Sequence, residues 1–171
     1  NNAAMWIKWQ DENIASNDHG LGIDNLILTP LFFPPPANDE CAGAIDFGTI
    51  SSSLSCQVVD LASATQSLPA TCGTGTNDVW YTFTVPASAG PLADVYYSTS
   101  GISGSTNRAF QIFFDCAGAG SAISCSNTQS GLFTVPPGTY RLRTYADAFS
   151  NFNLCLYLTP QIPSNDAICS A

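Results

Sequence analysis

Seven cysteines carry the most definite chemistry in this sequence of 171 residues. The chain has no CxxC pair, and its one histidine, His19, lies well before the first cysteine, so the spacing typical of a zinc site is missing. Disulfide bonding is the better interpretation, and it indicates an oxidising compartment outside the cytosol. In chain order the cysteines are Cys41, Cys56, Cys72, Cys116, Cys125, Cys155 and Cys169.

Proximity along the chain suggests how the first six cysteines pair. Cys116 and Cys125 flank a short Gly/Ala/Ser segment, so we predict that they staple a hairpin. Cys56 and Cys72 flank another loop, which leaves the first and sixth cysteines to tie the first strand to the last. Six cysteines allow 15 connectivities, so other pairings stay open.

Catalytic chemistry has little support in the sequence. A Ser-His-Asp or Cys-His arrangement needs a histidine beside the nucleophile, and we interpret His19 as a solvated loop residue. The chain has 13 acidic residues, yet none belongs to a recognisable pair of catalytic carboxylates. Asp39, Asp78 and Asp115 adjoin expected strand ends, where aspartate commonly bonds the turn backbone. We therefore predict structural roles for these acids, no catalytic residue, and a chain that is not an enzyme.

A calcium site is a candidate in the loop from Asp11 to Asn25. This loop is rich in carboxylate and amide oxygens, the ligands that Ca²⁺ takes, although it lacks the spacing of an EF-hand. Asp18 and Asp24 are the candidate ligands. The alternative is that these side chains form ordinary turn and cap hydrogen bonds. We expect no required cofactor, with Ca²⁺ as the one candidate.

Aromatic residues offer a candidate surface for sugars, which stack on exposed rings. Tyr96 and Tyr97 are adjacent in an expected strand, so their side chains point to opposite faces and one of them is expected to point outward. Tyr145 shares a strand face with Arg141 and Arg143. Tyr97 and Tyr145 are therefore the candidate glycan contacts. The competing interpretation is that these rings fill the core, because aromatic residues bury large apolar areas.

The charge balance excludes several partners. The net charge is −9, and only four residues are basic, so nucleic acid and anionic lipid surfaces would be repelled. No apolar run approaches the roughly 20 residues that span a bilayer, so we expect no membrane insertion. The first residues do not have the pattern of a signal peptide, which we interpret as a leader already removed or a chain that does not begin at the native start.

Alternation of apolar and polar residues predicts strands and almost no helix. In residues 78–85, for example, Val79, Tyr81, Phe83 and Val85 share one face. Several short strands separated by Gly/Pro turns imply an all-β fold, an antiparallel β-sandwich of the jelly-roll or immunoglobulin-like kind, stabilised by disulfides. The expected strands are 78–85, 92–98, 108–115, 132–135, 140–145 and 151–158, with 5–10 and 22–29 before them.

Prolines divide the chain, and the residues after two proline breaks are alike. Segment 36–44 shows Pro, a small residue, Asn-Asp and then Cys, and segment 163–171 repeats this pattern with one extra residue before the cysteine. This repetition predicts a tandem array of whole domains. The expected parts are the last strands of a preceding jelly-roll-like domain at 1–33, a proline linker at 34–36, a complete domain at 37–159, and a linker with the start of a next repeat at 160–171.

Residues 37–159 resemble the Cys-containing β-sandwich repeats of large secreted Bacteroidetes proteins, which are related to the pre-peptidase C-terminal domain. Residues 5–29 resemble the last strands of jelly-roll domains in such proteins, whose similar Ile-Asp-Asp ending often carries a structural calcium; Asp24 matches the first acid, while Asn25 replaces the second. The segments that carry the first resemblance are Asn38-Asp39-Glu40-Cys41, Asp78-Val79-Trp80-Tyr81-Thr82-Phe83, Phe113-Phe114-Asp115-Cys116, Pro137-Gly138-Thr139-Tyr140-Arg141-Leu142 and Phe152-Asn153-Leu154-Cys155.

The resemblance implies a non-catalytic structural or adhesive module. It implies one bead of a tandem-repeat protein, located extracellularly or on the bacterial outer surface, and exported by the type IX secretion route. Its expected partners are neighbouring domains of the same chain, with other copies in a filament (through strand exchange) or surface glycans as candidates. The alternatives are a carbohydrate-binding module and an accessory domain of a secreted hydrolase.

Overall fold

The computed structural model describes residues 33–116 and 122–159, together with residues 8, 27 and 29. The chain divides into two compact units, Asn1–Phe32 and Phe33–Ala171, and the described residues belong almost entirely to the second. Apart from residues 8, 27 and 29, the strands expected at 5–10 and 22–29 lie outside the described residues, as do the candidate ligands Asp18 and Asp24 and the second copy of the repeat.

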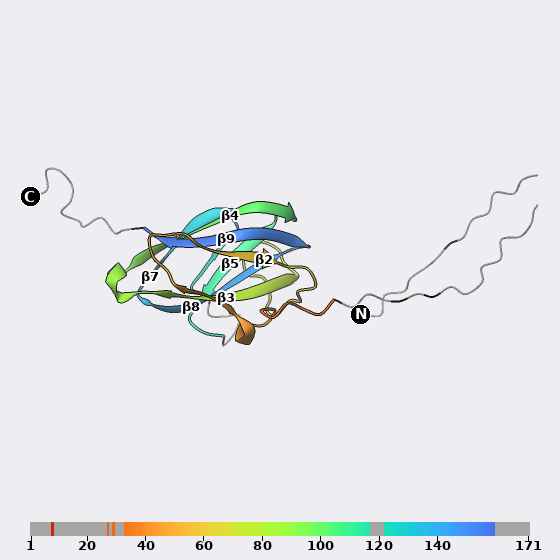
Figure 1. Cartoon of the computed structure of the whole chain (residues 1–171), viewed down its shortest axis with the longest axis horizontal. Helices are drawn as coiled ribbons and strands as arrows, with labels where there is room; N and C mark the ends of the chain where they lie inside the picture. Colours follow the sequence, from red (N-terminus) through yellow and green to blue (C-terminus); the bar gives the residue numbers. More distant parts are fainter. Residues whose placement is uncertain (1–7, 9–26, 28, 30–32, 117–121, 160–171) are drawn as a thin grey trace, which may run out of the picture. The chain divides into compact units, whose positions relative to one another are not determined.

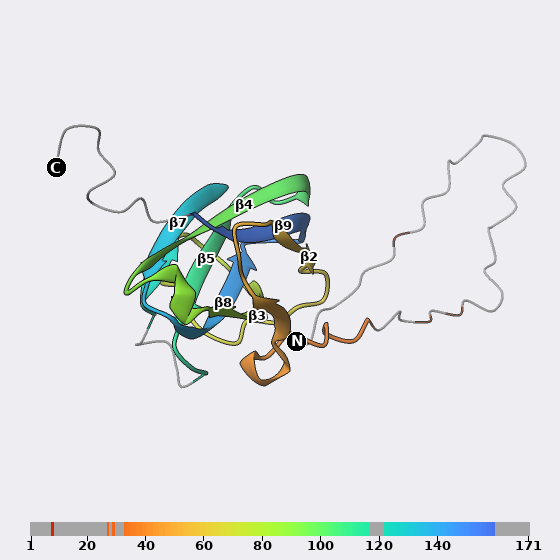
Figure 2. The ribbon, with the colours of Figure 1, turned by 60° about the vertical axis from the view of Figure 1, so that its left-hand side comes forward.

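The described part is an all-β sandwich of two facing sheets, as Figures 1 and 2 show with β4 and β9 in one layer and β3 and β8 in the other. One sheet has five strands in the order β1-β3-β8-β5-β6, and the other has four in the order β2-β9-β4-β7. The strands are β1 (Ile45–Thr49), β2 (Ser55–Asp60), β3 (Asn77–Val85), β4 (Ala93–Gly104), β5 (Arg108–Phe113), β6 (Ser124–Ser126), β7 (Ser130–Val135), β8 (Gly138–Ala146) and β9 (Ser150–Leu158).

The predicted fold class is confirmed, with one exception to antiparallel pairing. The β1 strand runs parallel to β3, and every other pair in the described sheets is antiparallel. Helical structure within the described ranges is limited to two short 3-10 turns, Cys41–Gly43 and Ala87–Ala89. No helix among these residues is long and apolar enough to cross a membrane.

The core lies between the two sheets and is filled by the apolar faces that alternation predicts. From β3 it takes the four residues that the sequence places on one face, and from β9 it takes alternate residues in the same way. Rings make many of the contacts, such as Tyr97 with Phe133 at 5.0 Å and Phe83 with Tyr140 at 5.5 Å between ring centroids. Alternation therefore identified most of the core without a structure.

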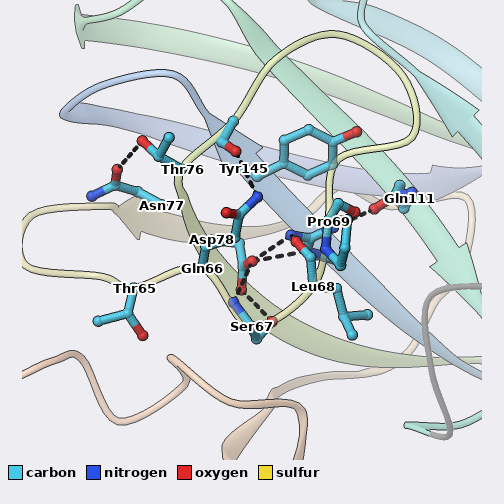
Figure 3. Close-up of polar contacts among 12 residues, drawn as sticks. Thr65, Gln66, Ser67, Leu68, Pro69, Thr76, Asn77, Asp78, Gln111 and Tyr145 are labelled. Carbon is cyan, nitrogen blue, oxygen red and sulfur yellow. Dashed lines mark hydrogen bonds and ion pairs between the residues drawn. The ribbon is translucent and has the colours of Figure 1, made fainter.

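The outer face of the five-stranded sheet is not open to solvent over its whole width. The long connection between β2 and β3, residues 61–76, folds back over β3, β8 and β5. Ser67 bonds Asp78 of β3 and Pro69 bonds Arg143 of β8 (Figure 3). Thr71 bonds Gln111 of β5. As a result Trp80 and Gln111, which point away from the core, are each 1% exposed. This covering loop therefore buries several side chains that strand alternation places on an outer face.

Candidate functional site

The covering loop is held by a buried ion pair between Asp78 of β3 and Arg143 of β8. Arg143 Nε donates to Asp78 Oδ2 at 3.0 Å, and its Nη2 also contacts that oxygen. The Nη1 group donates to Gln111 Oε1 at 2.8 Å and to the carbonyl of Pro69 at 3.1 Å, while Nη2 donates to the carbonyl of Leu68. This one guanidinium of β8 thus joins β3 and β5 to the backbone of the loop.

The Asp78 carboxylate, like the Arg143 guanidinium, makes several hydrogen bonds, as Figure 3 shows. It accepts hydrogen bonds from the backbone N–H of Ser67 at 3.0 Å and from its hydroxyl at 2.6 Å. The same hydroxyl accepts a hydrogen bond from Trp80 Nε1 at 2.9 Å. Because every oxygen is engaged and the pair is fully buried, this cluster is structural and cannot act as a general acid or base.

Asp39 has a similar role at the start of the domain. Its two carboxylate oxygens accept hydrogen bonds from the backbone N–H and the hydroxyl of Thr65, at 2.6 and 2.7 Å. The expectation of structural roles for Asp39 and Asp78 is therefore confirmed by their contacts. The partners are nevertheless distant in sequence, 26 residues away for Asp39 and 65 for the Asp78 ion pair, rather than in the adjacent turn.

All six cysteines of the domain form disulfides, but all three predicted pairings are wrong. Cys116 and Cys125 do not staple a hairpin with each other, Cys56 does not pair with Cys72, and Cys41 does not pair with Cys155. The observed disulfides are Cys41–Cys116, Cys56–Cys155 and Cys72–Cys125.

Sheet adjacency, rather than sequence proximity, explains this pattern. Cys56 and Cys155 are directly opposite each other in the antiparallel β2–β9 pair, although they are 99 residues apart in sequence. Cys125 lies on the edge strand β6, where the covering loop brings Cys72 within reach. The separations of 75, 99 and 53 residues explain why proximity along the chain gave no useful guide.

The two candidate glycan contacts are buried, so both expectations are wrong. Tyr97 is 1% exposed and packs in the core, where its hydroxyl bonds the Ser126 and Thr128 side chains. Tyr145 is fully buried because the covering loop lies over it, and its hydroxyl bonds the backbone of Cys72. Of the adjacent tyrosine pair it is Tyr96 that is partly exposed, on the outer face of the four-stranded sheet.

Metal-binding geometry is not found in the described ranges, where no cluster of three or more His, Cys, Asp or Glu side chains occurs. The candidate calcium loop is not described, so Asp18 and Asp24 stay predictions. The candidate sites within the sandwich are therefore pockets rather than metal or catalytic clusters.

Two pockets at the ends of the sandwich differ in chemistry. The larger, about 490 Å³, is lined by Ile50, Pro86 and Leu158 together with small and hydroxyl residues, and it has no titratable side chain. The smaller, about 180 Å³, lies where the β4–β5 turn, the covering loop and the end of β6 meet, and it includes Arg108. Arg108 is the one charged residue that lines either of these two pockets.

Arg108 begins β5 and is only 3% exposed. Its Nη1 donates to the carbonyl of Ser105 at 3.1 Å, and its guanidinium carbon lies 4.9 Å from the centre of the Phe152 ring. Its Nε and Nη2 atoms have no hydrogen-bond partner. Burial lowers the pKa of this guanidinium from its ordinary value. Sequence reasoning treated Arg108 only as the start of a strand, because neither its burial nor its missing partner is visible in the sequence.

These features define a class: a disulfide-stabilised β-sandwich domain of a secreted or extracellular protein. Residues 37–154 match a family described as "Galactose binding domain-like" and associated with the type IX secretion system, and the chain belongs to this family. Domains of this kind are non-catalytic accessory modules. The match confirms the relationship that the sequence motifs indicated.

Comparison with solved structures includes the pre-peptidase C-terminal domain of collagenase from Bacillus anthracis. The identity is 15%, the alignment covers 68% of this chain and 94% of that chain, and the TM-score is 0.38. Comparison with curated proteins gives no match.

Proposed function

We propose that the domain is a load-bearing spacer in a cell-surface or secreted protein, one bead of a tandem array that keeps its length under tension. The observation that supports this proposal most directly is the position of Cys56–Cys155. This disulfide joins the second strand to the last strand, so it connects the beginning of the domain covalently to its end.

Tension at the N-terminal end of the domain reaches Cys41 and β1 before it reaches β2, and at the C-terminal end it acts directly on β9. The chain enters β2 at Ser55 and leaves β9 at Leu158, and these two ends lie on the same side because the strands are antiparallel. Pulling there separates the strands one pair at a time, beginning with Ser55 and Leu156. The next pair is Cys56 with Cys155, so the disulfide stops the separation after one step.

The consequence is that most of the fold lies outside the path of force. The disulfide closes a separation of 99 residues. At about 3.4 Å for each extended residue, it withholds about 340 Å of chain from extension. The covering loop, the Cys72–Cys125 disulfide and most of the core belong to the withheld part, whereas Phe47 and Ile50 of the core precede it.

Single-molecule stretching of the whole chain, with handles at its two ends, tests the proposal. The oxidised chain should show no extension step from residues between Cys56 and Cys155. Full reduction should then lengthen the extended chain by about 340 Å. Replacing both Cys56 and Cys155 by Ala should lengthen it by only about 80 Å, because Cys41–Cys116 becomes the next covalent shortcut.

The matched control removes Cys72–Cys125 by Cys72→Ala and Cys125→Ala. This disulfide lies inside the withheld part, so its loss should leave the oxidised length unchanged. An oxidised chain that extends by several hundred ångströms, or a control that lengthens as much as the Cys56/Cys155 variant, would overturn the spacer role.

A further inference from the structure

The larger of the two pockets lies where the chain leaves the sandwich. Thr159, the residue directly after β9, lines this pocket together with Leu158. The backbone N–H of Thr159 donates to the carbonyl of Asp94 at 3.2 Å, and the N–H of Leu158 donates to the carbonyl of Ser51 at 2.7 Å. These bonds fix the point from which the following residues start, and that point is part of the pocket lining.

The pocket has the chemistry of a seat for an apolar side chain. Its volume is about 490 Å³, and none of its lining residues has a charged or amide side chain. A charged ligand would lose its hydration there without gaining a charged partner, whereas an apolar group gains from leaving water. The apolar lining residues are Ile50, Pro86, Ala89 and Leu158, and the others are Gly90, Ser51, Ser52, Ser88 and Thr159.

Backbone hydrogen bonds shape the pocket before any side chain enters it. The 3-10 turn Ala87–Ala89 is closed by the Ala89 N–H, which donates to the carbonyl of Pro86 at 3.0 Å. The N–H of Ile50 donates to the carbonyl of Thr84 in β3 at 2.9 Å. Because these lining segments are already ordered, seating a side chain between them costs the domain little conformational entropy.

The residues that follow Thr159 supply a suitable side chain within reach. Residues 160–163 are Pro-Gln-Ile-Pro, and Ile162 is the first large aliphatic residue after β9. It lies three residues beyond Thr159, a reach of about 10 Å in an extended chain. Each proline has a fixed φ, and the residue before a proline is restricted as well, so this segment has little freedom to lose on docking.

We propose that the Ile162 side chain occupies this pocket and clamps the linker between successive domains onto the sandwich. The inference rests on the tandem array of the proposed function, because the repeated Pro-small-Asn-Asp pattern begins at Pro163, directly after Ile162. A clamped linker leaves little free chain between the two domains, so the joint between them is stiff.

The entry linker of this domain lies at the opposite end of the β2–β9 pair. Pro34 and Pro36 line a pocket with Asp60, the last residue of β2. The exit pocket instead includes Leu158, which follows the pairing of Leu156 with Ser55 at the start of β2. Successive domains joined through these two ends would therefore follow one another end to end, which suits a spacer.

NMR spectroscopy of the whole isotope-labelled chain tests the contact directly. A nuclear Overhauser cross-peak should join the Ile162 δ1 methyl group to the methyl group of Ala89, which is distant in sequence. Ile162→Ser should remove this contact and shift the amide signals of Ser88, Ala89 and Gly90, while the signals of β3 stay in place. Either the absence of the cross-peak or unchanged amide signals in the variant would overturn the proposal.

Two further variants assign the effect to this side chain. Gln161→Ser is the matched control, because it introduces the same residue one position earlier between the same two prolines, and it should leave the signals of residues 88–90 unchanged. Shifts as large as those from Ile162→Ser would refute the clamp, since the linker backbone would then be their cause. A response of the pocket to Ile168→Ser in place of Ile162→Ser would also refute it. The stretching experiment depends on Cys56–Cys155 and not on Ile162, so failure of the clamp and failure of the spacer role are distinguishable.

Discussion

The Cys56–Cys155 disulfide permits a quantitative prediction of stability. Replacing both cysteines by Ala removes a cross-link while the other two disulfides remain. The unfolded chain is then freed from a covalent circuit that runs from Cys56 to Cys72, across to Cys125 and on to Cys155. That circuit contains about 46 residues, and the chain-entropy relation gives a loss of about 4 kcal/mol in the free energy of unfolding.

The substitution should have little other effect. Cys56 is exposed and Cys155 is partly exposed on the outer face of the four-stranded sheet, so alanine leaves no cavity in the core. Urea titration followed by tryptophan fluorescence measures the difference in unfolding free energy. Calorimetry should show a fall in Tm of about 10–20 °C for a domain of this size.

Reduction supplies the control. With all disulfides reduced, the native sequence and the Cys56/Cys155 variant should have the same stability, because the cross-link was their only important difference. A loss below about 1 kcal/mol under oxidising conditions would refute the reasoning, since it would mean that the unfolded circuit is already constrained by other means. A difference that persists after reduction would equally refute it, because the loss would then come from the side chains themselves.

Three further changes test the packing of the covering loop and the core. Asp78→Asn leaves the Arg143 charge buried without its partner and should cost about 3–5 kcal/mol by urea titration. Gly75→Ala would place a Cβ 2.3 Å from a Tyr145 ring carbon, so it should displace that ring and lower Tm. Burial raises the pKa of Tyr81 to about 12 from 10.0. The free energy of unfolding should therefore keep the full contribution of neutral Tyr81 below pH 10 and fall as pH rises towards 12. Tyr81→Phe should remove this component of the alkaline loss, about 2–3 kcal/mol, in pH-dependent unfolding.

The first two of these changes have matched comparisons. Asp46→Asn alters a carboxylate whose described bond is to the Gly48 N–H in an exposed turn, so it should cost under about 1 kcal/mol. Gly48→Ala meets no atom within 4 Å, although its φ of +77° adds some strain, and it should leave Tyr145 undisturbed. The alkaline measurements need Cys169 replaced by serine, because a free thiolate would exchange with the disulfides.

The sequence by itself determined the local periodicity and the class of the fold. The alternation in residues 77–85 and 150–158 is long and regular, so it identified β3 and β9 and the residues that they bury. The short strands β1, β2 and β6 were not predicted, because their polar residues and cysteines do not alternate clearly. The cysteine content likewise indicated disulfides and an extracellular setting without indicating partners.

Only the tertiary structure decided the pairings and the burial of charged and aromatic side chains. Cys56 meets Cys155 because β2 and β9 are neighbours in one sheet, which is a long-range property of the topology. Tyr145 is buried because residues 61–76 cover an outer face that strand periodicity alone would leave exposed. Arg108 is buried with two of its three guanidinium nitrogens unpaired, which strand periodicity does not reveal. Periodicity describes which side of a strand a residue occupies, but what covers that side depends on contacts between residues far apart in sequence.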